Sequence, residues 1–171
     1  MFDWFIKTFD SAQQQATLFS IVVSTILAIS LLLMNQWFTS RKAKADLKVL
    51  KLEELMNTLY AYERLCFDVI AQSYNKKAAE ESVFHKMTES VELADKIEML
   101  TTLYFPSIEY KSEDTQYLLS KIHVNCLLHA NAEEKWSEED RISLFNQDTS
   151  DIKSLISVIK NSAKIEMKKY T

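Results

Sequence analysis

A run of thirty positions, residues 11–40, carries no charged side chain, and no other feature restricts the fold of this chain as strongly. Its centre, residues 17–34, holds nothing more polar than serine or threonine. About 20 apolar residues in an α-helix, at ~1.5 Å rise per residue, cross the ~30 Å hydrocarbon core of a bilayer. The run therefore predicts one transmembrane helix over residues 11–40, with the lipid bilayer as its first partner.

Two other interpretations of the run are a cleaved signal peptide and a buried helix of a soluble protein. A signal peptide has a cationic start, a short apolar region and a small-residue cleavage site. Here Asp3 and Asp10 offset Lys7, the apolar run is longer, and residues 35–38 offer no such site. A buried soluble helix fits less well, because the run is apolar on all its faces.

The flanks of the run have the chemistry of membrane boundaries. Ser11 and Gln14 form a capping-box pattern that starts a helix. Trp37 follows the run where an interfacial aromatic residue is expected. Before it, residues 1–10 repeat apolar residues at the spacing of one helical face, with charged residues between them, which is typical of a short interfacial helix with Trp4 and Phe5 as further anchors. The alternative for this segment is a disordered tail.

Residues 41–51 form a basic collar with a net charge of +4. Its cationic residues are Arg41, Lys42, Lys44, Lys48 and Lys51. The positive-inside rule places this side in the cytoplasm, so we expect an inner (plasma) membrane protein with its N-terminus outside. Residues 52–171 have a net charge of −7, which disfavours nucleic acid as a partner. We therefore expect the collar to face anionic lipid.

The chain contains no glycine and a single proline, Pro106. Tight turns and close backbone approaches to phosphate usually require glycine. Its absence disfavours β-hairpins and excludes the usual P-loop, dinucleotide-binding and nucleophile-elbow motifs. The composition therefore predicts an all-α protein, in which the spanning helix continues into a cytoplasmic antiparallel bundle of about four helices over residues 41–171.

Four helical segments are expected in that domain, over about 41–74, 79–104, 112–130 and 138–169, with a possible break at 148–151. The first continues the spanning helix and has a heptad-like apolar face. Its predicted core residues are Leu52, Leu55, Leu59, Tyr62, Cys66 and Val69, widened by Met56, Tyr60, Phe67, Ile70 and Tyr74. The second segment should bury Phe84, Met87, Val91, Ala94, Ile97 and Leu100. The third should use Leu118, Leu119, Ile122, Cys126 and Leu127, and the fourth carries Ile142, Phe145, Ile152, Leu155, Ile156, Ile159 and Ala163.

Candidate chemistry is confined to a few side chains. His123, Cys126 and His129 share one predicted helix, where neighbours three apart could supply two metal ligands. The two histidines diverge by about 120° around that helix, so the preferred interpretation is a buried cysteine with histidines at the edge of the core. Glu63 interrupts an apolar stripe and is expected to pair with a lysine. No catalytic residue, metal or cofactor is predicted.

Small and hydroxylated residues follow one face of the spanning helix: Thr17, Ser20, Ser24 and Ala28. Such faces let two helices approach closely, and their hydroxyls can bond across the interface. The alternative is that each hydroxyl bonds to the carbonyl four residues earlier in its own helix. The pattern makes this face the candidate surface for helix–helix assembly.

These observations favour a non-enzymatic, single-pass membrane protein that self-associates, docks a cytoplasmic protein at the membrane, or does both. One alternative is a membrane effector of the defence or toxin type, in which assembled spanning helices line a pore. A second alternative is a helical bundle that senses a ligand or a metal.

Overall fold

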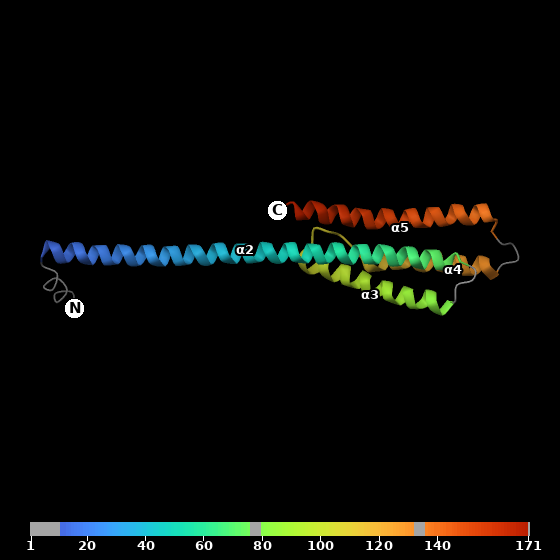
Figure 1. The fold of residues 1–171 in the computed structure, drawn as a ribbon, viewed down its shortest axis with the longest axis horizontal. Helices are drawn as coiled ribbons and strands as arrows, with labels where there is room; N and C mark the ends of the chain where they lie inside the picture. Colours follow the sequence, from blue (N-terminus) through green and yellow to red (C-terminus); the bar gives the residue numbers. More distant parts are fainter. Residues whose placement is uncertain (1–10, 76–79, 132–135, 171) are drawn as a thin grey trace. The chain divides into compact units, whose positions relative to one another are not determined.

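The computed structural model describes residues 11–75, 80–131 and 136–170 of the chain. Within these ranges the chain forms four α-helices and no strand, which confirms the predicted all-α class (Figure 1). The chain divides into two compact units, Met1–Asp46 and Leu47–Thr171. Helix α2 (Ala12–Ser73) contributes to both units, and the other three helices belong to the second. The segment over residues 1–10 lies outside the described residues.

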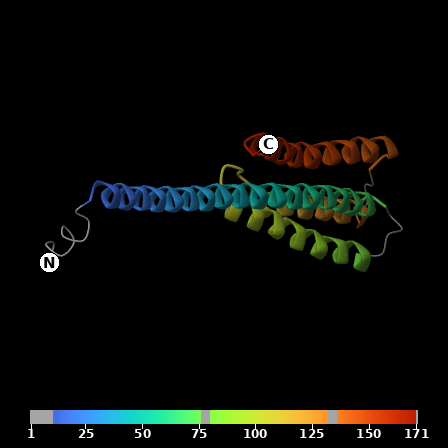
Figure 2. The same cartoon turned by 60° about the vertical axis from the view of Figure 1, so that its left-hand side comes forward.

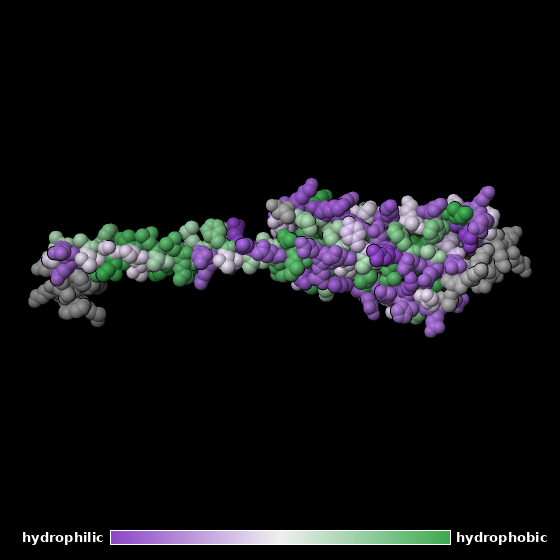
Figure 3. Space-filling model, viewed as in Figure 1, coloured by the Kyte–Doolittle hydropathy of each residue, from purple (hydrophilic) through white to green (hydrophobic). Residues whose placement is uncertain are grey.

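Helix α2 begins at the predicted serine cap. The Gln14 amide donates to Ser11 Oγ at 3.3 Å, and the Gln15 amide donates to the Ser11 carbonyl at 3.1 Å. The helix then continues to Ser73 without a break, which confirms the predicted continuity. One stretch of it is long and apolar enough to cross a membrane, and none of that stretch is buried within the protein (Figure 3).

The remaining helices end and begin where local chemistry requires. Helix α3 (Glu80–Tyr104) stops before Pro106, which cannot continue a helix. Helix α4 (Ser112–Asn131) starts where the Glu98 carboxylate accepts the Ser112 amide at 2.8 Å. Helix α5 (Glu138–Met167) has Ser137 as its N-cap, and the Ser137 hydroxyl oxygen accepts the Asp140 amide at 3.0 Å. The spacing of Ser137 and Asp140 in the sequence is typical of such a cap.

Ion pairs fix α3 antiparallel to α2. Lys86 Nζ lies 2.8 Å from Asp68 Oδ2, and Lys96 Nζ lies 3.0 Å from Glu54 Oε1. The partner on α2 therefore moves back along the chain as the residue on α3 moves forward. Figures 1 and 2 show α3 running beside the second part of α2 in both views.

Helix α5 is also antiparallel to α2, on another side of it. Lys160 Nζ lies 2.5 Å from Glu63 Oε2, and the Tyr74 hydroxyl donates to Asp148 Oδ2 at 2.6 Å. Helix α4, in contrast, runs in the same direction as α2. The second unit is therefore an up-down-up-down bundle, with each connected pair antiparallel, as expected for short loops.

Each helix contributes one apolar stripe to a common core. The buried apolar residues are Leu52, Leu55, Leu59, Tyr62, Leu65, Cys66, Val69 and Ile70 on α2; Val83, Ala94, Ile97 and Leu100 on α3; Phe105 and Ile108 in the following loop; Leu119, Ile122 and Cys126 on α4; and Ile152, Ile156, Ile159 and Ala163 on α5. All six residues of the predicted heptad-like face of α2 are in this core, so that prediction is confirmed. Of the residues expected to widen that face, Tyr60 is exposed.

The predicted inner face of α3 is wrong at two positions. Phe84 and Val91 are exposed, and the core side of the helix passes instead through Val83 and Ser90. Ser90 tolerates burial because its hydroxyl donates to the Met87 carbonyl at 2.7 Å and lies 3.3 Å from Gln116 Oε1. A search for apolar residues alone misses such a serine. It therefore places this part of the core face of α3 one residue too late, at Phe84 and Val91.

Helix α5 is also unbroken at 148–151, where a division is possible from the sequence. Asp148 accepts the Tyr74 hydroxyl instead of capping a new helix. The Thr149 hydroxyl is buried without a hydrogen-bond partner among the described residues. Phe145 and Ile152 pack on the same core across this point, which holds the two parts in one helix. In the same helix, Ile142 and Leu155 are exposed.

Candidate functional site

The predicted assembly face lies on the exposed N-terminal part of α2. Thr17 Oγ1 donates to the Gln13 carbonyl at 2.9 Å, so its hydroxyl is already bonded within the helix. The hydroxyls of Ser20 and Ser24 make no hydrogen bond within the described chain. Ala28 leaves the same face without a bulky side chain. Unbonded hydroxyls on a face of small side chains are available to a neighbouring helix.

Of the predicted interfacial anchors, only Trp37 falls within the described residues; Trp4 and Phe5 do not. Trp37 is exposed and makes an edge-to-face contact with Phe38, with ring centroids 5.0 Å apart. The Arg41 guanidinium lies 4.3 Å from the centroid of the Trp37 ring. An aromatic ring next to a cation suits the boundary between hydrocarbon and headgroups.

The basic collar divides into an exposed part and a part that binds the bundle. Arg41, Lys42 and Lys44 are exposed. Lys48 is half-buried; its ammonium donates to the Tyr104 carbonyl at the end of α3 and lies 5.1 Å from the Phe105 ring centroid. The sequence does not reveal this role of Lys48, because its contacts are 56 residues away in the chain.

Lys51, the last residue of the collar, pairs within α2 and also contacts the end of α3. Its ammonium pairs with Glu54 at 2.8 Å and lies 5.4 Å from the Tyr104 ring centroid. The hydrogen bond to Glu54 raises the pKa of Lys51, and the same bond lowers the pKa of Glu54. The exposed charges of the collar are therefore mainly those of Arg41, Lys42 and Lys44.

The three residues considered as metal ligands do not converge. His123 Nδ1 lies 3.0 Å from Ser73 Oγ, whereas His129 stacks on Trp136 with ring centroids 4.1 Å apart. Cys126 is buried in the core, as the preferred interpretation expects. No group of three histidine, cysteine, aspartate or glutamate side chains able to hold a metal occurs in the described part of the chain.

The two thiols have little nucleophilic character. Burial raises the pKa of Cys66 to about 12 and that of Cys126 to about 11. Only the thiolate reacts as a nucleophile or binds a metal, so both thiols are held in the unreactive form. Burial also lowers the pKa of His123, and the charge of Glu80 partly opposes this effect.

A polar seam crosses the core, and sequence periodicity does not predict it. Gln116 on α4 donates from Nε2 to the Tyr62 hydroxyl at 3.2 Å and lies near Ser90 on α3. The hydroxyls of Tyr110 and Thr115 lie 3.0 Å apart. Burial strongly raises the pKa of Tyr62, so the phenol stays neutral. A satisfied polar network of this kind fixes the register of the helices.

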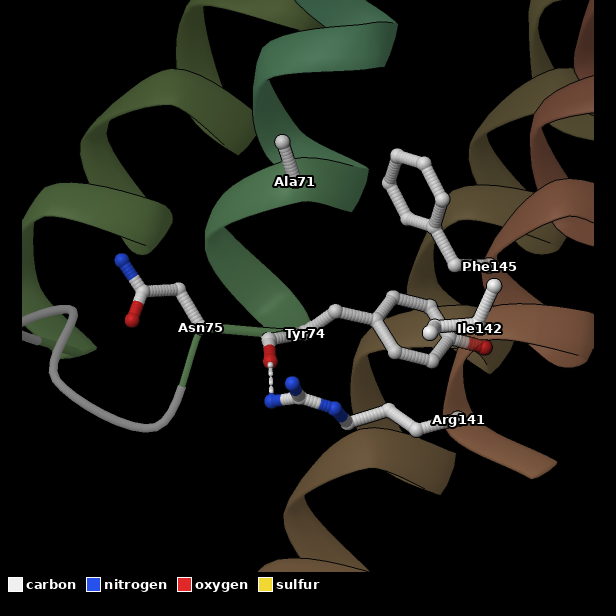
Figure 4. A pocket seen from close by; sticks show the side chains of 6 residues that line it. All are labelled: Ala71, Tyr74, Asn75, Arg141, Ile142 and Phe145. Atoms are coloured by element: carbon white, nitrogen blue, oxygen red, sulfur yellow. Dashed lines mark hydrogen bonds between the residues drawn. The ribbon is translucent and has the colours of Figure 1, made fainter. Parts of the chain in front are cut away.

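A small cavity of about 310 Å³ lies between the end of α2 and the start of α5 (Figure 4). Arg141 donates to the Tyr74 carbonyl at 3.3 Å and pairs with Glu138 at 2.5 Å. The Tyr74 ring contacts Phe145, with ring centroids 5.6 Å apart. The guanidinium of Arg141 and the ring of Tyr74 are therefore both engaged by other groups of the protein. These contacts close the end of the bundle and do not leave the two groups free to bind a ligand.

Comparisons with protein-family models, with curated proteins and with solved structures found no match to this chain. Among the described residues, apolar side chains are exposed on two parts of the protein. These are the apolar stretch of α2 and the outer faces of the bundle.

Proposed function

We propose that the chain is a non-enzymatic, single-pass membrane protein that self-associates through its N-terminal helix and presents a helical bundle to a cytoplasmic protein partner. The observation that carries the proposal is the exposure of the apolar stretch of α2. Eleven large apolar side chains between Phe19 and Met34 are exposed in the fold. Soluble monomers rarely expose a contiguous apolar patch larger than a few hundred Å². A bilayer is the environment that covers all faces of such a helix.

The orientation follows from the charges beside that stretch. Arg41, Lys42 and Lys44 follow it at once and are exposed, and the bundle comes after them. Cationic residues next to a span are retained on the cytoplasmic side. This supports an inner-membrane location with the bundle in the cytoplasm.

Self-association is supported by the state of the hydroxyls on α2. Ser20 and Ser24 carry no hydrogen bond in the described chain, whereas Thr17 and Thr25 bond to carbonyls of their own helix. In hydrocarbon an unbonded hydroxyl gains from a partner on a second helix, by roughly 0.6–2 kcal/mol. Two copies of α2 in contact along this face would supply that partner.

Docking of a cytoplasmic protein is supported by exposed apolar residues on the outer faces of the bundle. On α4 these are Tyr117, Val124 and Leu128, which share one helical face at spacings of seven and four residues. Helix α5 exposes Leu155 and Val158, three residues apart. Exposed aromatic and aliphatic residues in such a row are typical of helix-to-helix recognition.

The test of self-association compares two double variants of the full chain in lipid vesicles. S20L/S24L fills the small-residue face, whereas V22F/I26F adds bulk to the opposite face. Energy transfer between donor- and acceptor-labelled copies reports association. We expect S20L/S24L to weaken association roughly ten-fold or more, given two hydroxyl contacts and the lost close approach, and V22F/I26F to leave it unchanged. Equal effects of the two variants, or no energy transfer in the natural chain, would contradict the proposal.

The pore alternative shares this observation, because the same hydroxyls could line a conduit. Vesicles loaded with a potential-sensitive dye separate the two functions. A dissipated membrane potential that S20L/S24L restores would favour the pore. A stable potential at a density where energy transfer is high would favour the anchored bundle.

A further inference from the structure

One end of the bundle gathers segments that are distant in the sequence. Lys48 binds the carbonyl of Tyr104, and the Ser107 hydroxyl donates to Glu166 Oε2 at 2.9 Å. The start of the bundle part of α2, the end of α3, the loop over 105–111 and the last turns of α5 therefore lie together (Figures 1 and 2). We call this the collar end of the bundle. It lies entirely within the unit Leu47–Thr171.

Exposed cations at the collar end come from a part of the sequence far from the collar. Lys164 and Lys168, near the end of α5, are exposed and form no ion pair within the described residues. Lys111 is exposed just before α4; hydrogen bonds from Ser112 lower the pKa of the Glu98 carboxyl, and the charge of Lys111 adds to this effect.

Several carboxylates at the collar end are already engaged by the protein. Glu166 is buried and accepts hydrogen bonds from Ser107, Lys169 and Tyr170. Glu54 is shared between Lys51 and Lys96, which leaves one positive charge in excess. The exposed acids on the same segments are Glu53, Glu109, Glu113 and Asp114. The cations of α5 therefore keep their charge available to a partner.

Apolar side chains are exposed among these lysines. Leu50 is 58% exposed, Leu103 is 66% exposed and Ile165 is 63% exposed. Lysines interspersed with exposed aliphatic residues are typical of surfaces that lie in the headgroup layer, where the stem of lysine is apolar and its ammonium binds phosphate.

The opposite end of the bundle carries two acidic helix starts. Both α3 and α5 begin there, with Glu80 and Glu81 in the first turn of α3 and Glu138, Glu139 and Asp140 in the first turn of α5. The acidic first turns of α3 and α5 therefore lie at one end of the bundle, and the exposed lysines of α5 lie at the other, together with the acidic first turn of α4. An anionic surface would attract the lysines of α5 and repel the acidic first turns of α3 and α5 at the other end.

The chain itself brings the collar end close to a membrane that α2 spans. Only residues 41–46 separate the charge-free stretch from Leu47. Even fully extended, the link from Ser40 to Leu47 reaches only about 25 Å. A tethered surface binds at a high effective concentration, so weak contacts are sufficient.

We propose that the collar end of the bundle docks on the anionic surface of the bilayer, with Lys164 and Lys168 against lipid phosphates and Leu103 and Ile165 among the headgroups. The proposal rests on the membrane span proposed above. It goes beyond that span because it makes the C-terminal end of α5 a second membrane contact, which fixes which faces of the bundle point to the cytoplasm.

The test uses the full chain in nanodiscs of phosphatidylcholine, with or without about one third phosphatidylglycerol, and follows amide hydrogen exchange. Each lysine near an anionic surface favours binding roughly five-fold, so two lysines favour docking roughly twenty-five-fold. We expect amides of residues 105–111 and 164–170 to exchange up to that factor more slowly in the anionic discs. Residues 138–141, at the other end, should not change. High salt should reduce the difference, because it screens exposed charges.

Matched variants assign the effect to the collar end. K164E/K168E should abolish the difference between the two lipids. The control variant K121E/K153E should retain the difference between the two lipids. This variant makes the same change of charge at exposed positions that lie more than 10 Å from the collar end along the helices, at ~1.5 Å per residue. K164Q/K168Q, which removes charge without adding any, should behave like the first variant if the bundle stays folded by circular dichroism.

The failures of the two proposals are distinguishable. A chain that does not enter the discs refutes the membrane span. A chain that enters them, yet shows no dependence on anionic lipid, or loses that dependence equally in K121E/K153E, refutes docking of the collar end alone.

Discussion

The ion pair between Glu63 and Lys160 allows a quantitative test of how α5 packs on α2. The two charged atoms lie 2.5 Å apart, and the side chains of Lys160 and Glu63 are only 11% and 20% exposed. The Lys160 ammonium also lies 3.9 Å from the Tyr60 ring centroid. If α5 docks elsewhere in solution, Glu63 and Lys160 do not meet. Substitutions of the two residues then change the free energy of unfolding independently.

The magnitude follows from the burial of the pair. Removing one partner of a fully buried ion pair lowers stability by about 3–5 kcal/mol, whereas exposed pairs contribute about 0.2–1 kcal/mol. For this partly buried pair we expect Lys160→Met to lower the free energy of unfolding by about 2 kcal/mol, because Glu63 keeps an unpaired charge. The double variant E63Q/K160M should recover part of that loss, with a coupling energy of about 1–2 kcal/mol.

The assay is urea unfolding of the full chain in detergent micelles, followed by the fluorescence of Trp136 in a chain where Trp4 and Trp37 are replaced by phenylalanine. Trp136 stacks on Tyr74 and His129 in the bundle, so its emission reports on bundle packing.

The matched control is the pair of Asp68 and Lys86, whose side chains are 53% and 26% exposed. Its coupling energy should be smaller, at about 0.5 kcal/mol or less. A coupling energy for Glu63 and Lys160 no larger than that of the control would refute the packing of α5 described above.

Three further predictions concern titration, reactivity and capping. Burial lowers the pKa of His123 below 6.5, so as the pH falls through this value the unfolded chain binds a proton before the folded chain does. The bundle should therefore lose stability from pH 7 to 5.5, and His123→Asn should lose less over the same range in urea titrations. Burial raises the pKa of Cys66 and Cys126, so an aromatic disulfide reagent should react with them at least a hundred-fold more slowly in the folded chain than in urea; equal rates would count against a buried location. Ser137→Ala should lower the free energy of unfolding by about 1 kcal/mol by removing the cap of α5, and the exposed, non-capping Ser143→Ala should not.

How far the sequence predicts the fold depends on how regular each face is. On α2 the core residues recur with a helical period and are large and apolar, so the pattern alone identifies Leu52 to Val69. On α3 the core face includes Ser90, a small polar residue that is buried only because α4 supplies Gln116 as a partner. A contact to another helix is not visible in the pattern of one helix, and the predicted face is therefore rotated.

The same limit applies to the candidate site. The sequence indicates which residues follow the apolar stretch, and Arg41, Lys42 and Lys44 are exposed. It does not show that Lys48 leaves that group to bind the end of α3. Nor does it show that Lys164, more than a hundred residues away, lies at the same end of the bundle, because that depends on the number and direction of the helices between them.

Protease digestion of the full chain in sealed membrane vesicles tests the central claim most directly, which is that α2 crosses the membrane once and leaves the bundle in the cytoplasm. In inside-out vesicles, trypsin should cut at Arg41, Lys42 and Lys44 and leave the fragment N-terminal to the collar protected. In right-side-out vesicles the bundle should remain protected. A bundle protected in inside-out vesicles and cut in right-side-out ones would contradict the orientation, and a chain released from the vesicles by alkaline carbonate would contradict the span itself.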